Sequence, residues 1–210
     1  MKTEALIAAL AADTLPQQPV MRQLGQAMAL AVAVSGAAFT LFWGARPDIW
    51  AALGSLAVLK TFVPIALMLV SVALALALAH PGTRIARRGI ALGVLIALAA
   101  LGFLAAFARD GMAGLVSAVS TPSLITCLLS IPVLAAPVLA AMFWGLSSGA
   151  ALRPRLTGTV AGLAAGGLAA AIYSVFCDKD MALFVLPAYS AAIGGVALAG
   201  ALLGPRLLKW

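Results

Sequence analysis

The chain has 210 residues, of which 64% are hydrophobic and only 9% are charged. A soluble domain carries about 25% charged residues, so this composition excludes an ordinary soluble protein and indicates that most of the chain lies in lipid. The net charge of +7 does not indicate direct nucleic-acid binding, because the basic residues form no patch interleaved with aromatic side chains.

The N-terminal segment, residues 1–23, is the most polar stretch of the chain. Lys2 to Ala12 favours a helix, in which Leu6, Ile7 and Leu10 fall on one side and Asp13 follows at the end. An isolated helix this short is marginal in water, so we expect docking to order it, either in the groove of a partner protein or on the membrane surface. The predicted partner-binding residues are Leu6, Ile7, Leu10 and Asp13.

Residues 24–210 contain six long apolar runs. Each has about twenty residues, enough for a helix to cross a hydrocarbon core about 30 Å thick. The runs lack the alternating pattern of barrel strands, so the sequence predicts an all-α, polytopic integral membrane protein with six transmembrane helices. The spans are expected at 24–43, 61–79, 89–108, 124–146, 158–177 and 184–204. Two connectors contain apolar stretches, 49–59 and 112–119, that are too short to span and are expected to lie along the membrane interface; a longer, tilted second span is the alternative for the first.

The basic residues are distributed unequally between the two sides of these spans. Nine lie on the side of the termini and four on the other side. The nine are Lys2, Arg22, Arg84, Arg87, Arg88, Arg153, Arg155, Arg206 and Lys209, and the four are Arg46, Lys60, Arg109 and Lys179. Because Lys and Arg accumulate in cytoplasmic loops, both termini are expected in the cytoplasm.

Residues that carry catalytic chemistry are scarce. The sequence has no paired carboxylates, no Ser-His-Asp set, no phosphate-binding loop and no histidine cluster. No ionisable residue falls inside a span as drawn, although Lys60 and His80 lie at the edges of the second. Such groups usually mark proton relays and ion pathways. We therefore expect neither an enzyme nor a cofactor, and a pump or coupled transporter is disfavoured.

The two cysteines, Cys127 in the fourth span and Cys177 at the end of the fifth, are expected at similar depth near the outer face. Antiparallel helices that follow one another usually pack together, so the two thiols are expected to be neighbours. A disulfide is allowed in an oxidising compartment, and paired thiolates also suit soft metal ions. The alternative is that both are simply small buried apolar side chains.

Several segments resemble the NrsF family of membrane anti-sigma factors. They are the opening Lys2–Asp13, Cys127-Leu-Leu-Ser-Ile-Pro132, Gly162-Leu-Ala-Ala-Gly166 through Tyr173 to Cys177, and the closing Gly200–Trp210. The resemblance extends over the whole length. The sequence departs from the family pattern at Leu186-Pro187-Ala188-Tyr189, where a Trp-Tyr pair is expected.

The resemblance implies a multi-pass protein of the bacterial inner membrane that holds an extracytoplasmic-function sigma factor through its cytoplasmic N-terminal segment. A heavy-metal or oxidative stress signal, sensed at Cys127 and Cys177 by thiol oxidation or by metal ligation, then releases the sigma factor. An alternative from another class is a small facilitator or channel for a neutral solute, which the glycine-rich last two spans and the proline-containing fourth span would favour. A purely structural scaffold subunit, in which neither cysteine matters, is the third.

Overall fold

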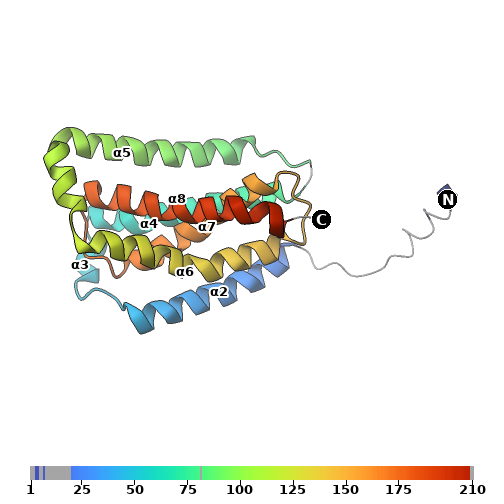
Figure 1. Cartoon of the computed structure of the whole chain (residues 1–210), viewed down its shortest axis with the longest axis horizontal. Coiled ribbons are helices and arrows are strands. Elements are labelled where there is room, and N and C mark those ends of the chain that lie inside the picture. Colours follow the sequence, from blue (N-terminus) through green and yellow to red (C-terminus); the bar gives the residue numbers. More distant parts are fainter. Residues whose placement is uncertain (1–2, 5–6, 8–19, 81, 209–210) are drawn as a thin grey trace.

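The computed structural model describes residues 3–4, 7, 20–80 and 82–208, and within them six long helices form a bundle (Figure 1). The long helices are α2 (Val20–Phe42), α4 (Leu59–Leu78), α5 (Ala86–Val119), α6 (Pro122–Leu146), α7 (Pro154–Ser174) and α8 (Ala182–Leu207). All six are long and apolar enough to cross a membrane. The prediction of an all-α membrane protein with six spans is therefore confirmed.

The helix ends follow local sequence signals. Both α6 and α7 begin with a proline, at Pro122 and Pro154, where the missing N–H costs nothing because the first turn of a helix has no partner for it. After α2 the chain turns at Gly44, whose φ of +76° is one that residues with a side chain rarely adopt.

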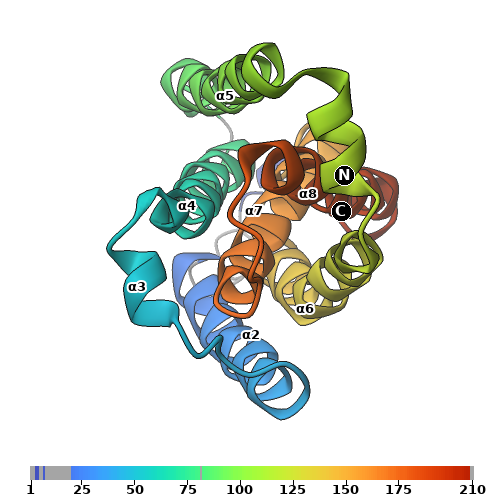
Figure 2. The same ribbon diagram turned by 90° about the vertical axis from the view of Figure 1, so that its left-hand side faces the viewer.

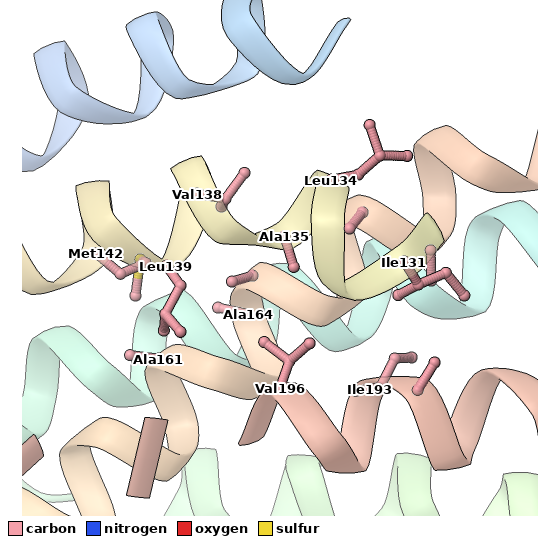
Figure 3. Packing of buried hydrophobic residues seen from close by; sticks show 14 of the residues in the cluster. Ile131, Leu134, Ala135, Val138, Leu139, Met142, Ala161, Ala164, Ile193 and Val196 are labelled. Carbon is pink, nitrogen blue, oxygen red and sulfur yellow. The ribbon is translucent and has the colours of Figure 1, made fainter. Parts of the chain in front are cut away.

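The bundle is organised around α7. In the end-on view of Figure 2, α7 lies in the middle, with α2, α4, α6 and α8 around it and α5 at the periphery. Ala161 and Ala164 of α7 are completely buried, and Figure 3 shows them surrounded by side chains of α6 and α8 such as Leu139 and Val196. Because α7 fills the axis of the described bundle, these residues offer no support for solute passage along that axis.

Small residues allow α7 and α8 to approach closely. A methyl group at Gly162 would lie 2.6 Å from both the Cα atom of Ala197 and the carbonyl oxygen of Val196. Gly158 likewise faces the backbone at Gly200. Contacts this close require glycine, because any side chain would collide with the facing backbone. Close approach matters in lipid, where helices associate through van der Waals packing and not through a strong hydrophobic driving force.

The two apolar connectors are helical. Residues 49–59 form the short helix α3 (Ile49–Leu53) and one turn, η1 (Leu56–Val58), before α4 starts at Leu59. Residues 112–119 continue α5 after a break at Gly111, which has a φ of +65°. In Figure 1 this last part of α5 turns across the end of the bundle toward α6. Neither connector lengthens a neighbouring span into a straight helix.

The structure places the ionisable residues Lys60, Arg109 and Asp110 at the edges of the spans, as the sequence predicts. Lys60 lies in the first turn of α4 and is buried. Arg109 and Asp110 fall within the bounds of α5, directly before Gly111, whose φ of +65° and ψ of −167° interrupt the helix. Because glycine adopts a positive φ readily, the chain breaks at this residue and the second part of α5 turns toward α6.

Candidate functional site

Both cysteines lie at one end of the bundle, where α2 leads into α3 and α7 leads into α8; we call this the cysteine end. Cys127 is in the second turn of α6, and Cys177 follows the last turn of α7. Their side chains are 0% and 3% exposed. Both belong to the same buried cluster, so the structure brings together the two thiols that the sequence placed at similar depth.

The two thiols are reduced and lie within a polar cluster. The Cys127 thiol donates a hydrogen bond to the hydroxyl of Tyr173 at 3.5 Å, and the Cys177 thiol donates to the carbonyl of Lys179 at 3.9 Å. The thiols are close enough to influence one another directly. The hydroxyl of Tyr189, from α8, is also near Cys177 and has no hydrogen-bond partner among the described residues. Two thiols and two phenols thus share one buried volume.

Two basic side chains hold the backbone at Cys177. The guanidinium of Arg46 donates to the carbonyl of Cys177 at 3.2 Å, and the ammonium of Lys60 donates to the same oxygen. Both basic groups also pair with Asp180, at 3.0 Å from Arg46 and 2.6 Å from Lys60. The side chains of Arg46 and Lys60 are 8% and 6% exposed. We call Arg46, Lys60 and Asp180 the ion cluster; it anchors the α7–α8 loop to α2 and α4.

The ion pairs with Arg46 and Lys60 lower the pKa values of two carboxylates in the connectors, Asp48 and Asp180. The hydrogen bond from Arg46 lowers the pKa of Asp48 from 3.8 to about 2. For Asp180, burial raises the pKa, but the hydrogen bonds from Arg46 and Lys60 outweigh it, and the net pKa is lowered. A carboxylate with a lowered pKa contributes stability above its ordinary pKa and loses it as pH falls through the folded value. The Asp48 contribution is therefore complete above about pH 4 and is lost toward pH 2.

Replacing Lys60 by Met should destabilise the bundle. The substitution keeps the aliphatic stem but removes a buried donor from Asp180 and from the Cys177 carbonyl. A buried acceptor left wholly without a partner costs about 1–3 kcal/mol. Arg46 still donates to the Cys177 carbonyl and to Asp180, whose side chain is 38% exposed, so we expect the lower half of that range. The measurement is the melting temperature of the detergent-solubilised protein.

Lys179→Met is the matched control, because the Lys179 ammonium pairs only with the exposed carboxylate of Asp178 among the described residues. Exposed ion pairs contribute little, so its melting temperature should stay near that of the parent. Equal melting temperatures for K60M and the parent would show that Lys60 of the ion cluster does not contribute to the stability of the fold.

Helix α2 connects the cysteine end to the N-terminal segment. At its end the Trp43 indole donates to Ser130 of α6 at 3.0 Å, and the Arg46 N–H donates to the Val175 carbonyl at 3.1 Å. Along its length α2 packs on α6, where Ser35 donates to the Leu134 carbonyl at 2.9 Å. Because α2 begins at Val20, its far end adjoins the segment that precedes the bundle.

The expected partner-binding residues are separate from this site along the chain. Leu6, Leu10 and Asp13 lie outside the described residues. Ile7 is described and is 58% exposed, so its side chain is open to contact.

The donor set at the cysteine end is small for a metal. Within residues 3–4, 7, 20–80 and 82–208, no group of three or more His, Cys, Asp or Glu side chains could hold a metal ion. Asp180 is engaged by Arg46 and Lys60. From this part of the chain, Cys127 and Cys177 alone would offer sulfur, a pair suited to a soft cation of low coordination number.

The sequence did not single out the ion cluster or the two tyrosines. Arg46 and Asp180 are 134 positions apart, and no local spacing links them. One signal was available: a lysine at the start of a span and an aspartate after Cys177 were predicted on the same side of the membrane, and opposite charges at a low-dielectric boundary tend to pair.

The comparisons with known proteins agree with the resemblance seen in the sequence. The model of the NrsF family, described as negative regulator of sigma F, matches residues 9–210. The anti-sigma-F factor NrsF of Caulobacter vibrioides (strain NA1000 / CB15N) is 32% identical, with both chains covered completely. The probable anti-sigma-F factor NrsF of Azospira oryzae (strain ATCC BAA-33 / DSM 13638 / PS) is 39% identical over 40% of each chain. No solved structure matches. With a match over nearly its whole length, this chain belongs to the NrsF family of negative regulators of sigma F.

Proposed function

We propose that this protein is a membrane-bound anti-sigma factor that sequesters an extracytoplasmic-function sigma factor and releases it when Cys127 and Cys177 react with a metal or oxidative signal. Family membership carries the anti-sigma role, because the full-length relative in Caulobacter vibrioides is an anti-sigma-F factor. The proposal places the protein in the bacterial inner membrane as part of a stress response.

The orientation in this proposal has both termini in the cytoplasm. Nine of the 13 Lys and Arg residues lie on the side of the termini, which favours that side as cytoplasmic. The first residues of α2 and the last residues of α8 lie at the same end of the bundle, opposite the cysteine end (Figure 1). In this orientation residues 1–23 reach a soluble partner through Leu6, Ile7, Leu10 and Asp13, and the thiols face the outer side.

The placement of both cysteines in one buried cluster supports a sensing role. A disulfide, or a soft cation held by both sulfurs, would join α6 to the α7–α8 loop and replace the hydrogen bonds that the thiols donate to Tyr173 and Lys179. The same loop is held by Arg46, which follows α2. In the proposed mechanism the change at the thiols shifts α2, and the shift of α2 lowers the affinity of the N-terminal segment for the sigma factor.

Release requires the two states of the protein to differ in affinity for the sigma factor. A tenfold loss of affinity corresponds to about 1.4 kcal/mol of differential binding. One or two lost hydrogen bonds along the path from Cys177 through Arg46 to α2 are of this size, at about 0.5–1.5 kcal/mol each. The path therefore needs no large rearrangement of the bundle to work.

Co-purification tests the anti-sigma role directly. The full-length protein, tagged at its C-terminus and solubilised in mild detergent, should retain a co-expressed extracytoplasmic-function sigma factor from the same organism. A sigma factor of another group, co-expressed in the same way, is the control and should remain in the flow-through. The proposal fails if every extracytoplasmic-function sigma factor of that organism also passes through unbound.

A further inference from the structure

A cavity of about 450 Å³ opens at the cysteine end. The α2–α3 connector, the first turns of α6 and the end of α7 form its walls. Trp43, Tyr173 and Phe176 supply apolar surface, and Arg46 and Asp48 supply charge. The cavity is large enough for a molecule of several non-hydrogen atoms, and its position gives it direct access from the phase that bathes the connectors.

The two cysteines differ in their relation to this cavity. Cys177 lines it, whereas Cys127 is not among the described residues that do. Cys127 is fully buried, and its thiol is bonded to the hydroxyl of Tyr173, a residue of the cavity wall. A molecule that enters the cavity therefore meets Cys177, a residue of the cavity wall, before it can reach Cys127.

The charged groups around the cavity are already engaged with one another. Arg46 binds Asp48 at 2.6 Å and Asp180 at 3.0 Å, and Lys179 binds Asp178 at 3.3 Å. With Lys60, the three basic residues balance the three carboxylates Asp48, Asp178 and Asp180. Since each charged side chain of the cavity wall is already paired with an opposite charge, selection at this cavity is by size and by reactivity toward sulfur.

We propose that this cavity is the entry port for a small, uncharged, thiol-reactive electrophile, and that Cys177 is the residue it meets first. The inference rests on the proposed sensing function, of which it takes the oxidative signal rather than the metal, and it adds the route of that signal and an order between the two thiols. Cys127 is then the second thiol, reached only after the first has reacted or moved.

Methyl methanethiosulfonate is a suitable probe because it is small, neutral and specific for thiols. In its reaction the Cys177 sulfur bonds to the methylthio sulfur, the S–S bond of the reagent breaks, and methanesulfinic acid leaves with the thiol proton. The full-length protein in detergent is treated with limiting reagent, and intact-mass spectrometry follows the added methylthio group over time.

Single-cysteine variants give the order of reaction. C127S, which retains Cys177, should be modified at least about tenfold faster than C177S, which retains Cys127, because access limits the reaction of a buried thiol. Equal rates, or faster modification of Cys127, would overturn the assignment.

A blocking variant tests the port itself. Thr126 lines the cavity, whereas its neighbour Ile125 is 64% exposed and does not line it. In the C127S background, Thr126→Trp should slow modification of Cys177 by about tenfold, and Ile125→Trp should leave it unchanged. Gel filtration verifies that each variant is folded. If a folded T126W variant reacts at the rate of its parent, the cavity is not the route.

This experiment can fail independently of the proposed function. If the order and the block hold but a protein without cysteines still responds to inducer, the port is real and the sensing role is wrong. If the cysteines are needed for induction but the order or the block fails, sensing stands and the port is wrong.

Discussion

Removal of residues 2–19 should make transcription of the sigma-factor targets constitutive. The deletion leaves α2 intact from Val20 onward and removes the expected contact residues Leu6, Ile7, Leu10 and Asp13. If these side chains supply even about 3 kcal/mol of the binding free energy, affinity falls more than a hundredfold. We expect reporter expression without inducer to reach the fully induced level, measured in cells that carry the deletion variant in place of the parent protein.

A second variant distinguishes the loss of the apolar contacts from the shortening of the chain. The triple substitution L6D/I7D/L10D keeps the length and should also release the sigma factor, because three carboxylates replace the apolar face. Immunoblots of the membrane fraction must show parental protein levels for both variants. Repression that persists in the deletion variant at normal protein levels would mean that the N-terminal segment does not hold the sigma factor.

Replacement of both cysteines by serine should abolish induction and leave repression intact. Serine is close in size to cysteine but forms neither a disulfide nor a strong bond to a soft metal ion. The N-terminal segment is untouched, so uninduced expression should equal that of the parent. The dose–response of the reporter to a soft metal ion or an oxidant should become flat at every concentration that the cells tolerate.

Ser130→Ala provides a matched control for loss of a polar group at the same end. Ser130 is buried one turn after Cys127 and accepts the hydrogen bond of Trp43, but it has no redox or soft-metal chemistry. It should reduce stability modestly, by about 1 kcal/mol, and keep induction. If the double-cysteine variant responds to inducer like the S130A protein, the thiols are not the sensor.

The helices were accessible to sequence reasoning because length and hydropathy decide whether a segment crosses a membrane. Their ends were not, since capping and tertiary contacts shift them: α2 starts at Val20 rather than at residue 24, and α5 passes through Gly111 to Val119. The single glycine decides the second case, because its positive φ lets one helix bend and resume where any other residue favours a stop.

The proximity of the thiols could be predicted from depth alone, because two residues at equal height on antiparallel neighbouring helices are near one another. The surrounding groups could not. Lys60 was correctly predicted at a span edge, but that position does not reveal that its ammonium pairs with the Cys177 carbonyl and with Asp180. Tyr189 lies on a third helix, and its approach to Cys177 depends on how α8 packs against α7, which depends on glycines far from the site.

The central position of α7 has a consequence for how any local disturbance spreads. Helix α7 touches α2, α4, α6 and α8 at once, and its glycines meet the backbones of both α8 and α4, so it has no free side toward which to rotate. A displacement of α7 at the Cys177 end is therefore transmitted to all four neighbouring helices. Among the six long helices of the described residues, α5 is the one that lies at the periphery and packs on α8 and α4 rather than on α7 (Figure 2).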